Sequence, residues 1–145
     1  MDLLPSRAIR RLLLVTACTA CSAESALPAT DDGTAHMRPA EQGASSALYF
    51  TLRNPGRDTL VLYDVVIDVA GHSMIHRSVE SNGMASMEHE DSVVVPPGDS
   101  VVFRERGLHV MAMGLRAALH GGDTVVARLH FRPARVDTIR ALVRE

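Results

Sequence analysis

Methionines and histidines gathered in one stretch are the side chains of this sequence best suited to chemistry. Residues 72–113 contain four of the seven His and five of the seven Met. They are His72, Met74, His76, Met84, Met87, His89, His109, Met111 and Met113. Thioether sulfur is a soft ligand and imidazole a borderline one, and no Cys lies in this stretch. The ligand types therefore favour copper(I) over zinc, calcium or magnesium.

Buried Met in a β-rich chain often does no more than fill gaps in the core, and that interpretation has to be weighed. The segment 76–91 (HRSVESNGMASMEHED) is rich in charged and small residues, which suits a surface better than a core. A surface Met gains little free energy from burial. The segment therefore favours a ligand role for sulfur over core packing, with the role of Met84 left open between a position beside the ligands and loop filling.

The spacing within the stretch is that of residues on a β-strand. Side chains two residues apart on a strand point to the same side, so His109 and Met111 would present their ligand atoms together. His72, Met74 and His76 share this spacing. A second copper(I) or copper(II) site that uses His72, Met74 or His89 stays open, with solvated polar residues as the simpler interpretation.

The spacing His76-X10-Met87-X21-His109-X-Met111 resembles the motif of the PCu(A)C family of periplasmic copper chaperones. Other stretches are similar to that family, and the resemblance extends over about residues 36 to 143. These stretches are residues 47–49, 54–56, 82–84, 95–98, 109–115 and 122–125.

The resemblance implies a cupredoxin-like β-sandwich that binds one copper(I) per monomer at a solvent-accessible site of two His and two Met. The implied ligands are His76, Met87, His109 and Met111. It also implies delivery of the copper toward the CuA site of cytochrome c oxidase, to the apo CuA domain or to a thioredoxin-like copper protein. His72, Met74 and His89 depart from the family pattern and leave the copper stoichiometry open.

The sequence predicts that the elements which position these ligands are β-strands. Leu48, Phe50 and Leu52 alternate with more polar residues, and Val93–Val95, the turn at 96–99 and Ser100–Arg104 predict a hairpin. The other predicted strands are residues 59–69, 124–131 and 135–143. Short strands separated by turn signals predict an all-β, antiparallel β-sandwich or Greek-key barrel, with the copper-binding domain at 41–145.

The first 22 residues have the layout of a signal peptide, with three arginines before a short apolar run. That run is too short to span a bilayer as a helix. Cys18 ends a lipobox-like Val-Thr-Ala-Cys sequence, so either cleavage before Cys18 with lipidation or ordinary cleavage further on fits. Residues 23–40 would form a tether. The predicted location is the periplasm or the extracytoplasmic face of a membrane.

Several function classes are disfavoured by the composition. The net charge is −2 and aromatic residues make up 3% of the chain, which argues against nucleic-acid binding. No Cys follows Cys21, so a blue-copper electron-transfer site lacks its thiolate ligand. No catalytic constellation is recognisable, so we expect no enzyme. A copper-sequestering tolerance protein with no oxidase acceptor would use the same residues and remains the alternative function.

Overall fold

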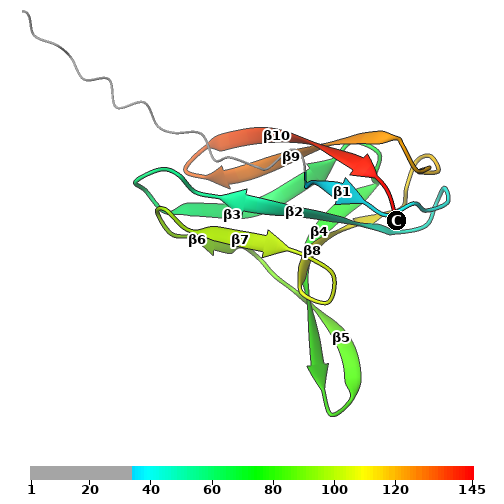
Figure 1. Cartoon of the computed structure of the whole chain (residues 1–145), viewed down its shortest axis with the longest axis horizontal. Coiled ribbons are helices and arrows are strands. Elements are labelled where there is room, and N and C mark those ends of the chain that lie inside the picture. Colours follow the sequence, from blue (N-terminus) through cyan, green and yellow to red (C-terminus); the bar gives the residue numbers. More distant parts are fainter. Residues whose placement is uncertain (1–33) are drawn as a thin grey trace, which may run out of the picture.

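The computed structural model describes residues 34–145, so the expected signal peptide and Cys18 lie outside the described residues. The described part folds into strands, with no helix among them, as Figure 1 shows. No segment of residues 34–145 forms a helix with the length and apolar character needed to cross a membrane. The strands are β1 (His36–Met37), β2 (Ser46–Arg53), β3 (Leu60–Ile67), β4 (His72–Ser81), β5 (Met84–His89), β6 (Val93–Val95), β7 (Ser100–Phe103), β8 (Leu108–Met113), β9 (Thr124–Arg132) and β10 (Arg135–Val143).

The strands form one continuous hydrogen-bonded sheet that curls around the core. Its order is β5-β4-β8-β2-β1-β10-β9-β3-β6, and β7 adds to β2. Strand β3 packs near β4, which is far from it in this order, so the sheet folds over on itself. All pairs are antiparallel except β1 with β10, which is parallel. The expected all-β class is confirmed.

The core is built from every second residue of the strands, because side chains along a strand point alternately inward and outward. Leu48, Phe50 and Leu52 of β2 are buried, as are Val125, Ala127, Leu129 and Phe131 of β9. Phe50 stacks on Phe103, with ring centroids 4.2 Å apart. These apolar rows hold the outer face of the sheet in a fixed position.

The predicted hairpin at 93–104 is wrong in its pairing, although its turn is correct. Gly98 has a φ of +74°, and the Asp99 N–H donates to the Pro96 carbonyl at 3.2 Å, as a type II turn requires. However, β6 pairs with β3, and β7 pairs with β2. A turn reverses the chain but does not choose the partners, and here each strand gains a buried neighbour elsewhere.

The folded domain begins before the expected tether boundary at residue 40. Strand β1 pairs with both β2 and β10, and Ala35 and Met37 are buried. The Ala40 N–H also donates to the Leu119 carbonyl at 3.2 Å. Two buried positions are too few to give a visible sequence period, so this strand forms through its partners.

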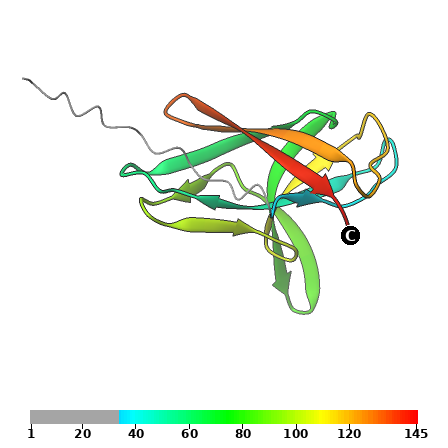
Figure 2. The ribbon, with the colours of Figure 1, turned by 45° about the horizontal axis from the view of Figure 1, so that its top comes forward.

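Strands β4 and β5 form a hairpin whose far end projects away from the body in both views (Figures 1 and 2). Asn82 and Gly83 lie at its tip with φ of +53° and +75°, the backbone that a two-residue type I′ turn needs. Every residue of β5 is exposed. The expectation that Met84 and Met87 lie at the surface is confirmed, because their exposed fractions are 72% and 60%.

Candidate metal centre

The register of β4 against β8 brings the His/Met stretch together. His76 lies opposite His109, and Met74 lies opposite Met111. Directly paired residues on neighbouring strands point to the same side of a sheet. The residues between them, Ile75 on β4 and Val110 on β8, are buried in the core. The His and Met side chains therefore lie together on the outer face.

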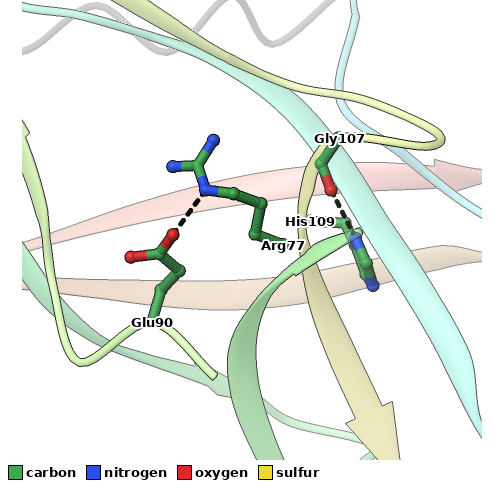
Figure 3. Close-up of polar contacts among 4 residues, drawn as sticks. All are labelled: Arg77, Glu90, Gly107 and His109. Atoms are coloured by element: carbon green, nitrogen blue, oxygen red, sulfur yellow. Dashed lines mark hydrogen bonds and ion pairs between the residues drawn. The ribbon is translucent and has the colours of Figure 1, made fainter. Parts of the chain in front are cut away.

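His109 is the most enclosed of the expected ligands, with an exposed fraction of 3%. Its ring lies between those of Tyr49 and His76, at centroid distances of 6.4 and 6.1 Å. Its Nδ1 is 2.9 Å from the Gly107 carbonyl oxygen. Figure 3 draws this contact. A carbonyl only accepts hydrogen bonds, so Nδ1 carries the proton and the lone pair of Nε2 is free to bind a metal.

His76 is half-buried and has a ring nitrogen without a partner. Its Nδ1 is shielded from solvent and has no hydrogen-bond partner among the described residues. The pKa of His76 is lowered from its ordinary value of 6.5, first by burial and then by the neighbouring His109 and His89. The neutral imidazole, which is the form that ligates metals, is thereby favoured.

The two expected thioether ligands flank this histidine pair along the strands. Met111 follows His109 by two residues on β8 and is half-buried. Met87 lies on β5 opposite Ser78, one same-face position beyond His76 toward the hairpin tip. Hence His76, His109 and Met111 lie on adjacent strands of the sheet body, and Met87 approaches from the projecting arm.

The base of this arm is fixed to the sheet by polar contacts. The guanidinium of Arg77 forms an ion pair with Glu90, drawn in Figure 3. The Glu90 N–H donates to the Ile75 carbonyl at 2.9 Å. Arg77 and Ile75 flank His76, so these contacts restrain the backbone that carries it.

Register also places residues that spacing left undecided. His89 lies directly opposite His76, with ring centroids 6.0 Å apart, so it is nearer to that ring in register than Met87 is. Met113 shares the outer face with Met111. The Asn82-Gly83 turn signal could have indicated the register of β4 with β5. No sequence signal indicates the register of β4 with β8. In residues 34–145, no group of three His, Cys, Asp or Glu is arranged to hold a metal ion.

The other histidines lie away from this face or at its margin. His120 is in an exposed loop beside Asp123. His130 lies on β9 near Tyr63, with a centroid distance of 6.3 Å. His36 is part of β1, with its ring 5.2 Å from that of Tyr49. The candidate centre is therefore the mixed His/Met face of β5, β4 and β8.

Comparison with known proteins shows the family of the chain. Residues 29–143 match the family model "LpqE-like", described as "Putative lipoprotein LpqE-like". The chain belongs to the LpqE-like family. A relative from Leifsonia xyli subsp. xyli, named "Putative lipoprotein Lxx21020", is 25% identical over 112 residues, which are 77% of this chain and 67% of the relative.

Solved structures with a similar fold include PCuAC domains and a copper(I)-bound protein. The solution structure of CuI-DR1885 from Deinococcus radiodurans is 27% identical, with a TM-score of 0.62 over 88% of this chain and 85% of that one. The copper-bound PCuAC domain from PmoF2 is 23% identical, with a TM-score of 0.61 over 75% of this chain and 86% of that one. The expected cupredoxin-like β fold is confirmed.

Proposed function

We propose that this protein is an exported copper(I) metallochaperone in which His76, Met87, His109 and Met111 bind one copper(I) as cargo. The observation that carries the proposal is the cross-strand pairing of His76 with His109 on the outer face of the sheet, beside Met111. Two relatives of the same fold are named as copper-bound or copper(I)-bound, which supports the choice of metal.

The ligand chemistry fits a metal that is bound and then passed on. Imidazole binds a metal in its neutral form, and thioethers favour the reduced ion. Met87 is 60% exposed, so an acceptor could approach the metal from the arm side. A set of imidazole and thioether ligands with one strongly exposed member releases copper to a stronger partner more readily than a buried thiolate cage would. The proposed activity is therefore binding and transfer, with no catalytic step.

We propose that the acceptor is the CuA site of cytochrome c oxidase, reached directly through its apo CuA domain or through a thioredoxin-like copper protein. The copper-loaded protein is expected to metallate an apo CuA domain faster than it loses copper to a chelator that reacts only with free copper. Stopped-flow absorbance of the CuA chromophore measures this rate. The reaction mixture contains an electron acceptor, because CuA also contains oxidised copper. Equal rates would contradict direct transfer.

The same residues would serve a sequestering protein, and a cell experiment separates the two functions. Delivery predicts that deletion of the gene lowers oxidase activity under copper limitation and that added copper restores it. Normal oxidase activity together with new copper sensitivity would replace delivery by sequestration. Neither outcome of the cell experiment changes the proposed metal site.

Copper(I) affinity is expected to fall on acidification, and the part of the affinity that His76 supplies is expected to fall at a lower pH than an ordinary imidazole would show. Protons compete with the metal for imidazole, and the lowered pKa of His76 moves that competition to lower pH. Affinity measured between pH 7.5 and 5 checks this. The variant His89→Ala removes a neighbour that lowers the pKa of His76, so its affinity should begin to fall at higher pH. A pH-independent affinity would contradict ligation by the histidines.

We also propose that the mature protein is anchored on the extracytoplasmic side of a membrane by a lipid on Cys18. The lipoprotein names of its family and relative support this location. Mass spectrometry of the N-terminal peptide tests it. An unmodified N-terminus downstream of Cys21 would replace the anchor by ordinary signal cleavage and leave the copper proposal unchanged.

A further inference from the structure

The outer face of the β4–β8 ladder carries only His and Met side chains. Its three outward-facing register pairs are His76 with His109, Met74 with Met111 and His72 with Met113. His and Met together make up about a tenth of the chain. Three further positions occupied only by His or Met would arise by chance on the order of one time in a thousand.

The proposed copper(I) site uses only half of these six residues, together with Met87 from the arm. We propose that the other three, His72, Met74 and Met113, form a second copper(I) position on the same face. This inference rests on the proposed function and adds a second metal position to it. The ligand set would be one imidazole and two thioethers, which is soft and electrically neutral.

Register and exposure both fit a metal position here. His72 lies opposite Met113, and Met74 is two residues from His72 on the same strand. Successive same-face positions on a strand are about 7 Å apart, so the ligand atoms of these three side chains are within reach of a single ion. Met74 has an exposed fraction of 41% and His72 is also exposed, so copper can reach them.

Packing alone does not account for these residues. The opposite face of the same strands fills the core with Ile75, Val110 and Ala112, which are all buried. Met74 points away from that core and keeps an exposed fraction of 41%, so its thioether gains less from burial than a core side chain does. The end of the ladder is also held firmly, because the Gly71 N–H donates to the Met113 carbonyl at 3.0 Å.

Met111 connects the two positions. It is opposite Met74 and follows His109 by two residues, so it borders both ligand sets. A copper ion that moves between them can keep the Met111 sulfur while it exchanges its other ligands. The second position would then lie near the first residues of β4, on the side away from the hairpin tip.

Anaerobic copper(I) titration against a competing chelator tests the second position. The full chain is used with Cys18→Ser and Cys21→Ser, because free thiols would bind copper(I) themselves. This protein is expected to bind two copper(I) per chain. His72→Ala with Met74→Leu and Met113→Leu is expected to bind one. A matched control, His120→Ala with Met84→Leu, changes one exposed His and one exposed Met outside the ladder and is expected to keep two.

Met113 is half-buried, so the pair His72→Ala with Met74→Leu gives a second variant that changes only exposed residues. It is also expected to lose the second equivalent. The second position would be overturned if the protein with an unchanged β4–β8 face bound one copper(I) per chain, or if both variants of that face still bound two. Either result would leave the proposed function intact. No copper(I) binding in any protein would overturn the proposed function itself.

Discussion

Replacement of His109 and Met111 together by alanine is expected to lower the affinity for the copper(I) of the proposed four-ligand site by at least ~100-fold. Half of the proposed ligand set is lost, and the loss of a residue that merely orients a ligand already costs about 10–100-fold in metal affinity. His109 contributes most, because its burial and its bond to Gly107 fix the ring with Nε2 free. Titration under a competing chelator measures the change.

The same titration of His120→Ala with Met84→Leu provides the control, since both side chains are exposed and lie outside the proposed set. Its affinity is expected to stay within about threefold of the parent, because the removal of exposed groups that contact no ligand costs little. Thermal unfolding shows whether each variant is folded. A folded His109/Met111 variant with unchanged copper(I) affinity would show that the metal is bound elsewhere.

Phe50→Ala is expected to lower the free energy of unfolding by about 3–5 kcal/mol, the usual cost of a buried Phe truncated to Ala. Phe50 has an exposed fraction of 2% and stacks on Phe103. Its strand, β2, also pairs with the site strand β8, through Ser46, Ala47 and Leu48. Chemical denaturation measures the change, and a stable domain has only about 5–15 kcal/mol in all.

Val102→Ala is the matched control for the core variant. Val102 lies on β7 opposite Thr51, next to the Phe50–Phe103 pair, but its exposed fraction is 51%. Its truncation is expected to change stability by less than about 0.5 kcal/mol. Similar losses for Phe50→Ala and Val102→Ala would mean that the stacked rings do not anchor the core.

The sequence by itself determined the strand pattern and the kinds of ligand. Alternation of apolar and polar residues follows from the two-residue period of a strand, which is fixed by the covalent chain. For the same reason, the spacing of His109 and Met111 placed both on one side of a strand. The exposure of Met84 and Met87 was predictable as well, because their neighbours are charged or small.

Only the tertiary structure decided which strands are neighbours. It separated β6 from β7, and it added β1 to the sheet although two residues carry no periodic signal. It also set His76 opposite both His109 and His89. Pairing between distant segments depends on which apolar faces can be buried together, and a shift of one residue would turn every side chain to the other face. The row of His and Met across β5, β4 and β8 is a consequence of that register.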